Sequence, residues 1–323
     1  MPFEAIAAPE ALLRAWQRYA RGKRRRPSVA AFAQRAEQHV LDLADALADG
    51  SYRPRTHRLL TVRDPKPRLI AIAPVRDRVV HRAIYDALAP DFHRGLTADT
   101  FACLEDRGSH RAILRFLDGM RRHRYVLHLD IQRYFPSVDH AVLRALLVPR
   151  LRDRRIHGLI DALLASGDRL YRRPEVVAFY PRDDLARGRG LPIGNLTSQW
   201  WANLYLSGFD HHVKRVLNVG TYLRYMDDLV LFDDDRARLR QHRAAIADWL
   251  CTERRLTLNG RKGHIRSTGQ PQTYLGYRVS RAGIRVGSRA VHRLRQRLPE
   301  LIAAGDAARL DASLDAWRAV ATF

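Results

Sequence analysis

The chain has 323 residues, 46% hydrophobic and 28% charged, which is the usual composition of a globular protein with a sizeable core. No stretch of uninterrupted apolar residues could span a membrane. The formal net charge of +23 favours a polyanionic partner such as nucleic acid, although the rarity of lysine beside so many arginines also indicates a bias in coding composition.

The cysteines and the N-terminal residues indicate the cellular compartment in which the protein is expected. Cys103 and Cys251 are far apart in sequence, without metal-ligand spacing or a disulfide framework. The first residues form an amphipathic pattern that does not resemble a secretion signal. We therefore expect a cytoplasmic protein with no membrane partner.

The first third of the chain alternates between helical and strand patterns. Apolar residues follow helical spacing over 11–49, around a basic run, and Gly50 ends that pattern. Arg58–Val62 and Arg68–Ala73 have the pattern of two strands, joined in a hairpin with a basic tip. Helical spacing returns over 75–88.

The middle of the chain contains a strand that runs directly into an acidic residue. This strand is predicted over Tyr125–Leu129, immediately before Asp130, and a helix is predicted over 138–147. Residues 150–189 are mixed and charged, with no clear element. A long amphipathic helix is expected over 196–216.

A second acidic site lies in a predicted hairpin over 222–232. Met226 and Asp227 occupy its turn, where Asn-Gly or Asp-Gly is the common pair. Such an unfavourable turn with two adjacent acids suggests that function overrides local preference. The remaining predicted elements are a helix over 236–254, short strands over 256–258 and 273–279, and a basic helical region from 291 to the end.

Three aspartates, Asp130, Asp227 and Asp228, suit nucleotidyl transfer. That reaction uses two divalent metals about 3.5 to 4 Å apart. Carboxylate oxygens suit Mg²⁺, and an antiparallel sheet could bring all three aspartates to one edge. An Asp-Asp pair alone is more often a solvated turn or a helix cap.

The neighbouring residues resemble those of reverse transcriptases. The resemblance rests on Leu129-Asp130-Ile131-Gln132-Arg133-Tyr134-Phe135 and Tyr225-Met226-Asp227-Asp228, with further blocks in the order of that family. It covers nearly the whole chain, from about the first helix to the short strand at Tyr277. It implies an RNA-directed DNA polymerase with an α+β right-hand fold. The expected parts are an N-terminal helical region (1–50), fingers (51–124), an antiparallel-sheet palm (125–284, with a fingers insertion at about 145–190) and a small helical thumb (285–323).

The resemblance also implies roles for individual residues. Two Mg²⁺ ions, with Mn²⁺ as an alternative, are expected on Asp130, Ile131, Asp227 and Asp228, and Lys262 is expected to donate a proton to pyrophosphate. The expected nucleotide contacts are Arg68, Lys66, Ile131, Phe135, Ile193, Gly194 and Gln199. The expected nucleic-acid contacts are Arg76, Arg78, Tyr274 and Gly276.

Each of these roles has a structural alternative. Arg68 and Lys66 can pair with phosphate or remain solvated hairpin charges. The ring of Phe135 can exclude a 2′-hydroxyl or simply pack in the core. Lys262 could be a surface residue, and the four nucleic-acid candidates could instead form ion pairs or cap the core.

The block Gly190–Gln199 indicates which group of reverse transcriptases the chain resembles most. Mobile-intron enzymes show Gln-Gly and then Ser-Pro, whereas this chain has Ile193-Gly194 and then Ser198-Gln199. That variant resembles the reverse transcriptases of diversity-generating retroelements, which copy a template RNA with errors at adenines and work with a small basic accessory protein. The expected partners are then template RNA, primer, cDNA, dNTPs and such a protein.

Two alternatives remain open. A retron-type or defence-type reverse transcriptase would share the chemistry and use another template. A maturase-like RNA-binding protein would bind without synthesis, although clustering three acids beside a polyanion would bring it no benefit.

Overall fold

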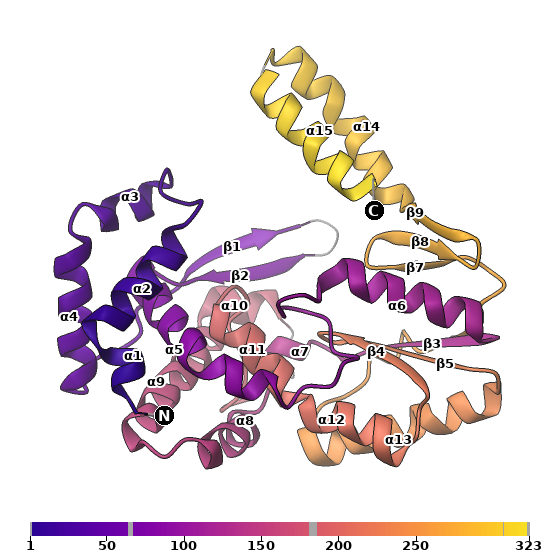
Figure 1. Ribbon diagram of the computed structural model, residues 1–323, viewed down its shortest axis with the longest axis horizontal. Helices are drawn as coiled ribbons and strands as arrows, with labels where there is room; N and C mark the ends of the chain where they lie inside the picture. The colour runs from indigo at the N-terminus through magenta and orange to yellow at the C-terminus, as the bar shows by residue number, and fades with distance from the viewer. Residues whose placement is uncertain (1, 64–66, 181–185, 306, 322–323) are drawn as a thin grey trace. The chain divides into compact units, whose positions relative to one another are not determined.

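The protein divides into two compact units that each combine segments distant in sequence. The structure is a computed structural model and describes residues 2–63, 67–180, 186–305 and 307–321 (Figure 1). Unit 1 comprises Met1–Thr97, Ile131–Asp210 and Asp248–Thr257, and unit 2 comprises Ala98–Asp130, His211–Ala247 and Leu258–Phe323. Helices and antiparallel sheets occur in both units, which confirms the α+β class expected from the sequence.

Unit 1 is mostly helical. Its elements are α1 (Glu4–Ala7), α2 (Pro9–Ala20), α3 (Pro27–Ala33), α4 (Ala36–Ala48), β1 (Arg58–Val62), β2 (Arg68–Ile72), α5 (Val75–His93), α7 (Tyr134–Ser137), α8 (His140–Leu147), the 3₁₀ turn η1 (Val148–Arg150), α9 (Arg154–Tyr171), α10 (Pro174–Phe179), α11 (Leu196–Tyr205) and α12 (Ser207–His211), whose last residue belongs to unit 2. The apolar stripe of α2 packs on α5 and α4, and α5 also packs on α11.

The predicted hairpin of β1 and β2 is confirmed as an antiparallel pair, with Arg58 opposite Ile72 and Val62 opposite Arg68. Its tip, 64–66, lies outside the described residues. Leu69 and Ala71 are buried in a cluster with side chains of α9 and α10, and burying a large apolar side chain contributes about 1.5 to 3 kcal/mol. This contact anchors β2 on one face and leaves β1 largely exposed.

Two expectations for unit 1 were wrong. The charged stretch 150–189 contains the helix α9, whose buried residues include Ile156, Ile160 and Leu163, so an apolar stripe lies among the charges. The long helix expected over 196–216 is broken after Tyr205 into α11, α12 and a π-helical turn, η3 (His212–Val216). The break brings Gly208 close to Arg254, because a Cβ at position 208 would lie 2.7 Å from its Nη2.

Unit 2 contains two sheets. Its elements are α6 (Gly108–Arg122), β3 (Tyr125–Asp130), η3, β4 (Thr221–Tyr225), β5 (Asp228–Asp233), β6 (Ile265–Ser267), β7 (Gln272–Tyr274), β8 (Tyr277–Ser280), β9 (Gly283–Val286), α14 (Ser288–Ala303) and α15 (Ala307–Ala321). The helix α13 (Arg236–Arg254) begins in unit 2 and ends in unit 1.

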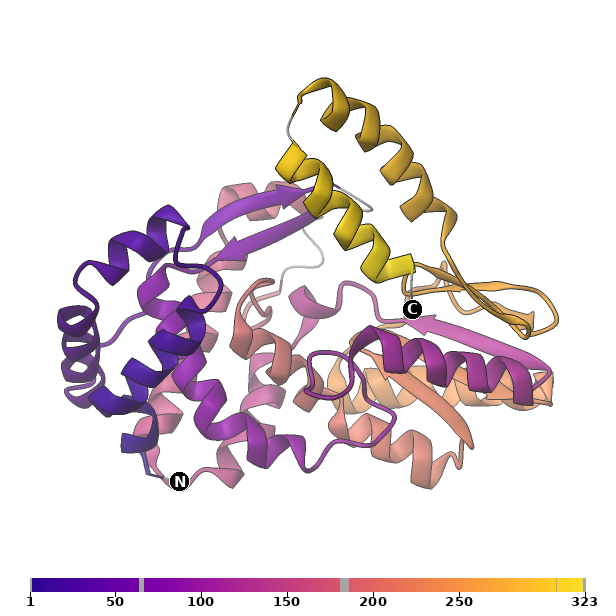
Figure 2. The same ribbon diagram turned by 45° about the horizontal axis from the view of Figure 1, so that its top comes forward.

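The larger sheet has the strand order β4-β5-β3-β6, and all three of its neighbouring pairs are antiparallel. Helix α6 lies along one face of this sheet and also contacts β8 of the smaller sheet β7-β8-β9 (Figure 2). The aromatic core between them includes Phe116, Phe232 and Tyr274. Gly119 permits this packing, because a Cβ there would lie 2.5 Å from the Phe232 ring.

The C-terminal part of unit 2 differs from the expected pattern. The single strand expected over 273–279 is a hairpin of β7 and β8 whose loop residues, Leu275 and Gly276, have φ of 45° and 89°, as a type I′ turn requires. The strand expected over 256–258 is absent from the assigned strands. The C-terminal helical region consists of two helices, separated at Gly305, which has a φ of 63°.

Candidate active site

Two of the predicted metal ligands face each other across neighbouring strands. Asp130 ends β3, Asp228 begins β5, and the antiparallel register pairs them directly. Like charges at opposed positions of a sheet repel each other. The pairing of the two strands therefore holds the carboxylates together against their mutual repulsion.

The third aspartate lies in the turn before β5. Tyr225 pairs with Asp228, so Met226 and Asp227 form a two-residue loop. Met226 has a φ of 56°, the left-handed region that favours glycine, and such a residue stores about 1 to 3 kcal/mol of strain. The buried guanidinium of Arg224 donates a hydrogen bond of 3.2 Å to the Met226 carbonyl, which supports the strained turn.

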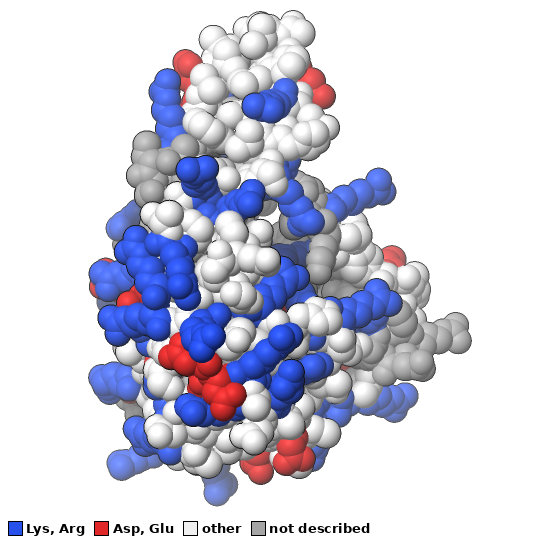
Figure 3. Space-filling view, turned by 90° about the vertical axis from the view of Figure 1, so that its right-hand side faces the viewer, with Lys and Arg blue, Asp and Glu red and all other residues white. Residues whose placement is uncertain are grey.

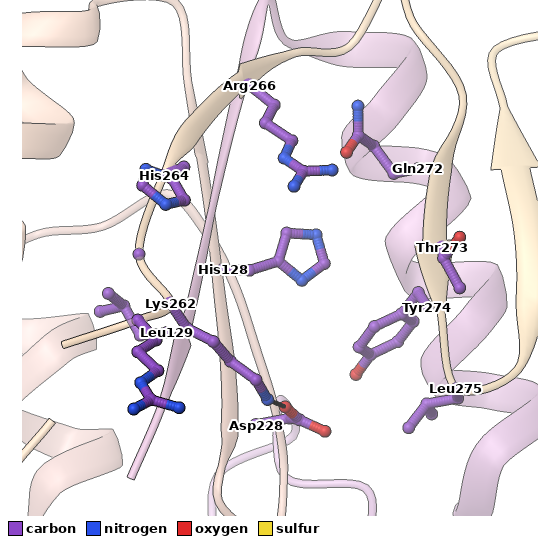
Figure 4. Close-up of a pocket in the computed structure, with 12 residues that line it drawn as sticks. His128, Leu129, Asp228, Lys262, His264, Arg266, Gln272, Thr273, Tyr274 and Leu275 are labelled. Atoms are coloured by element: carbon purple, nitrogen blue, oxygen red, sulfur yellow. Dashed lines mark ion pairs between the residues drawn. The ribbon is translucent and has the colours of Figure 1, made fainter. Parts of the chain in front are cut away.

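Lys262 lies against this carboxylate pair. Its Nζ donates a hydrogen bond of 2.6 Å to Asp130 Oδ1 and lies 3.7 Å from Asp228 Oδ1. Figure 4 shows the ammonium group pointing toward Asp228. Two carboxylates thus share one cation.

Asn259 is a further contact of Asp130 that the sequence analysis did not identify. Its Nδ2 donates to Asp130 Oδ2 at 2.9 Å, and its backbone N–H donates to the Asp130 carbonyl at 2.8 Å. The two bonds fix both the side chain and the backbone of Asp130. The available signal was the proximity of Asn259 to Lys262 in one short block.

The electrostatics of the site follow from this crowding. Burial, with the neighbouring charges of Asp228 and Asp130, raises the pKa of Asp227 to about 6. Burial also raises the pKa of Asp228, against the opposing effect of Lys262. Burial lowers the pKa of Lys262, but its hydrogen bond to Asp130 and the nearby carboxylates outweigh this effect, so the net pKa is raised and the ammonium stays protonated.

The donor atoms suit a hard divalent cation, but they do not form a complete cage. Across the ranges that the structure describes, no group of three His, Cys, Asp or Glu side chains is arranged to hold a metal ion. Asp130 and Asp228 already share a cationic group, and Mg²⁺ commonly takes its remaining ligands from water and substrate phosphates. The arrangement therefore fits a metal held by few protein ligands.

Several predicted nucleotide contacts meet within unit 1. The Leu191 N–H donates to the Phe135 carbonyl at 2.8 Å, and the Ala71 N–H donates to the Ile193 carbonyl at 2.7 Å. Gly194 has a φ of 119°, and a Cβ there would lie 2.9 Å from the Ala71 carbonyl oxygen. These contacts bring together β2, α7 and the segment before α11, and they require glycine at position 194.

The remaining nucleotide candidates differ in exposure. Arg68 is exposed at the start of β2, and Gln199 and Phe135 are half-buried. The side chain of Ile131 is buried, so only its backbone can face a ligand. Lys66 lies outside the described residues.

The two candidate template contacts, Arg76 and Arg78, both have partners within unit 1. Arg76 Nη1 lies 3.5 Å from the buried carboxylate of Asp77. Arg78 donates to the Ala73 carbonyl at 2.7 Å and to the Tyr19 hydroxyl at 2.9 Å. A role in template binding must therefore compete with these internal contacts, and it stays a prediction.

The primer candidates, Tyr274 and Gly276, lie at the β7–β8 turn. The Tyr274 ring stacks on Phe116 with 4.5 Å between centroids, so it is part of the core. The Gly276 carbonyl accepts a hydrogen bond of 3.0 Å from the Gly287 N–H. Tyr274 thus packs in the core and also lines a cavity beside Asp228 and Lys262.

The surface carries the excess of positive charge seen in the composition. Figure 3 shows one face on which lysine and arginine far outnumber acidic side chains. Such a surface attracts the phosphate backbone of nucleic acids without regard to sequence. Within the described ranges, no helix is both long and apolar enough to cross a bilayer.

Comparison with known proteins places these features in a family. The family model "Reverse transcriptase (RNA-dependent DNA polymerase)" matches residues 62–279, which include all three aspartates and Lys262. Protein YkfC of Escherichia coli strain K12 is 26% identical over 288 residues, covering 77% of this chain and 73% of YkfC.

Solved telomerase structures share the fold. The telomerase of Candida albicans, in complex with a fragment of telomeric RNA, has a TM-score of 0.50 and 12% identity, over 73% of this chain and 46% of the telomerase. The apo telomerase of Candida tropicalis truncated from its C-terminal domain has a TM-score of 0.50 and 10% identity, over 72% of this chain and 55% of the telomerase. This chain therefore spans about half the length of these telomerases.

Proposed function

The chain belongs to the reverse transcriptase family of RNA-dependent DNA polymerases and has their α+β right-hand polymerase fold, and on that premise we propose that it copies a template RNA into cDNA by two-metal nucleotidyl transfer. The pairing of Asp130 with Asp228, beside Asp227 and under one shared cationic group, carries this proposal. A protein that only bound RNA would gain nothing from acids so buried and so close together that the pKa of Asp227 rises to about 6.

The proposed chemistry assigns a task to each residue at this edge. Asp130, Asp227 and Asp228, with the Ile131 backbone, would hold Mg²⁺, which activates the primer 3′-hydroxyl and steadies the leaving pyrophosphate when bound. Lys262 is protonated and can donate a proton to the departing pyrophosphate.

The proposed contacts with the incoming nucleotide come from residues of unit 1. The side chain of Arg68 is exposed and makes no hydrogen bond or ion pair with the described residues, so its guanidinium is available to a triphosphate. Phe135 keeps part of its ring exposed beside the buried Tyr134, which favours contact with the sugar over pure core packing. Gln199 and Lys66 are the further proposed contacts.

The proposed division into fingers, palm and thumb also rests on the elements. The β1–β2 hairpin would belong to the fingers, the four-stranded sheet with α6 and α13 to the palm, and α14 with α15 to the thumb. Arg76, Arg78, Tyr274 and Gly276 would contact template and primer.

The subtype proposed is the error-prone enzyme of a diversity-generating retroelement, working with a small basic accessory protein. Ile193 supports this proposal, because it occupies the position where a glutamine is expected. The Ala71 N–H donates a hydrogen bond to its backbone carbonyl, which fixes the backbone there. Its side chain is aliphatic and half-buried. Without that hydrogen-bonding group, the pocket can enforce base-pair geometry less strictly.

Primer extension on an RNA template with Mg²⁺ tests the general proposal. We expect synthesis by the native protein and none by Asp228→Asn, while Asp311→Asn, a charge-matched change on the exposed surface of α15, remains active. An RNA-binding protein without synthesis would give no extension with any of the three.

Sequencing of the cDNA tests the subtype. We expect errors concentrated at template adenines, and we expect Ile193→Gln to reduce them relative to other errors. An even error spectrum in the native protein would favour a retron-type or defence-type enzyme.

A further inference from the structure

A cationic cavity of about 320 Å³ lies within unit 1, between the segment that precedes β1 and the C-terminal half of α9. Its volume falls at the lower end of the range of about 300 to 1,000 Å³ that is typical of small-molecule sites. None of its lining residues is among the proposed catalytic, nucleotide or nucleic-acid contacts. The cavity is therefore a candidate for a separate ligand.

Three arginines line this cavity, and within the described part of the chain no carboxylate does. The guanidinium of Arg173 is held in place: it donates a hydrogen bond of 2.6 Å to the His57 carbonyl and one of 3.2 Å to Glu175. The side chains of Arg55 and Arg169 are exposed and make no hydrogen bond or ion pair with the described residues. Two guanidinium groups at the cavity are thus available to an anion.

A buried hydroxyl adds a more specific donor to the cavity. Ser166 lines it from α9 and is only 6% exposed, yet its hydroxyl makes no hydrogen bond with the described residues. Its Oγ is not sealed from solvent in the core, as Nε1 of Trp200 is, so a ligand can reach it. Buried polar groups are almost always hydrogen-bonded, and a helical serine can bond to a carbonyl one turn earlier. The unpaired hydroxyl therefore indicates a missing partner.

His57 supplies a second donor at the cavity wall. Its ring is buried, and its Nε2 lies 3.0 Å from Nδ2 of Asn195. An amide nitrogen only donates, so Nε2 accepts and the ring hydrogen lies on Nδ1. Burial, with the charges of Arg173 and Arg78, lowers the pKa of His57 to about 4, so the ring is uncharged at neutral pH. Its Nδ1 hydrogen makes no bond with the described residues and can serve a ligand oxygen.

We propose that this cavity binds a phosphate monoester, carried by the 5′ end of an RNA or by a free nucleotide, between Arg55, Arg169 and Ser166. The polar side chains available at the cavity are donors, and a phosphate monoester brings about 1.5 to 2 negative charges and three acceptor oxygens at neutral pH. Guanidinium groups pair with such oxygens through two parallel hydrogen bonds. A carboxylate has one charge and two oxygens. An internal phosphodiester has one charge and is flanked by nucleosides on both sides.

Fluorescence anisotropy of a short adenine-only RNA, labelled at its 3′ end, tests the proposal with the full chain in EDTA. Because the positive surface attracts any RNA, the measured quantity is the ratio of the affinities for the 5′-phosphorylated and 5′-hydroxyl forms. We expect the phosphorylated form to bind at least about tenfold more tightly. Competition by adenosine 5′-monophosphate identifies the source: it removes the preference if the site takes free nucleotides, and it leaves the preference intact if the site needs a chain end.

Variants locate the phosphate. Arg169→Gln should abolish most of the preference for the phosphorylated RNA, whereas Arg154→Gln should preserve it. Arg154 is a matched control, because it is an exposed arginine at the start of the same helix and does not line the cavity. Ser166→Ala removes only the hydroxyl, so it should reduce the preference about two- to tenfold. Circular dichroism confirms that each variant is folded.

Several outcomes would overturn the proposal. These are equal affinity for the two RNA forms, a full preference in Arg169→Gln, and an equal loss in Arg154→Gln and Arg169→Gln. Displacement of the phosphorylated RNA by a glutamate-rich peptide as effectively as by unlabelled RNA would show a carboxylate site instead. Loss of the preference in Arg68→Ala would place the phosphate in the nucleotide pocket. None of these results depends on whether the chain synthesises DNA.

Discussion

Replacing Asp227 by asparagine should stabilise the metal-free protein at alkaline pH. The rise of the Asp227 pKa from 3.8 to about 6 means that ionisation costs the folded state about 3 kcal/mol more than the unfolded chain. The side chain is partly exposed, so solvent screening reduces this to about 1 to 2 kcal/mol. Asparagine avoids the cost because it does not ionise.

The sign of the effect fixes its pH dependence. Since the folded-state pKa lies above the unfolded value, the protonated carboxyl contributes full stability below pH 3.8, and this contribution is lost as the pH rises through about 6. The gain from Asp227→Asn should therefore be about 1 to 2 kcal/mol at pH 8 and close to zero at pH 4.

Urea unfolding of the native protein and the variant in EDTA measures this difference at both pH values. Asp311→Asn, on an exposed surface, controls for the change in net charge. An equal gain at pH 4 and pH 8, or a loss at pH 8, would refute the argument that burial and the neighbouring carboxylates destabilise the ionised Asp227.

We expect three further outcomes for substitutions in unit 2. Asp228→Asn should reduce primer extension about 1000-fold or more without weakening RNA binding in filter assays, because a metal ligand supplies several kcal/mol to the transition state; parallel losses of binding and synthesis would contradict this. Asn259→Ala should lower kcat about 10- to 100-fold through looser placement of Asp130, with an unchanged KM for dNTP in steady-state kinetics; a rise in KM alone would count against it. Gly119→Ala should cost about 1 to 3 kcal/mol in chemical unfolding, because its Cβ would overlap the Phe232 ring, and an unchanged midpoint would show that the ring can move aside.

The strand carrying Asp130 and the hairpin carrying Asp227 could be predicted from the sequence. Both depend on local signals: a short apolar run that ends in an acid, and two such runs with two residues between them. Met226 in the turn was the clue to function, and its φ of 56° shows the strain that the poor turn chemistry implied.

Features that depend on tertiary contacts could not be predicted. Asn259 and Lys262 were read as one block, but nothing in their spacing indicated that both hold Asp130, some 130 residues earlier. Helix α6 was missed altogether, and α9 was hidden because charged residues surround its apolar stripe.

The interleaving of the two units constrains how the chain can fold during synthesis. Unit 1 needs Asp248–Thr257, and unit 2 draws on segments on both sides of that stretch, so neither is complete until most of the chain has left the ribosome. Nascent chains generally fold domain by domain from the N-terminus, but here even unit 1 cannot be completed before residue 257 has been made. Contacts between residues so distant in sequence form slowly. Chains halted before residue 257 lack part of unit 1, so they should expose apolar surface and depend on chaperones.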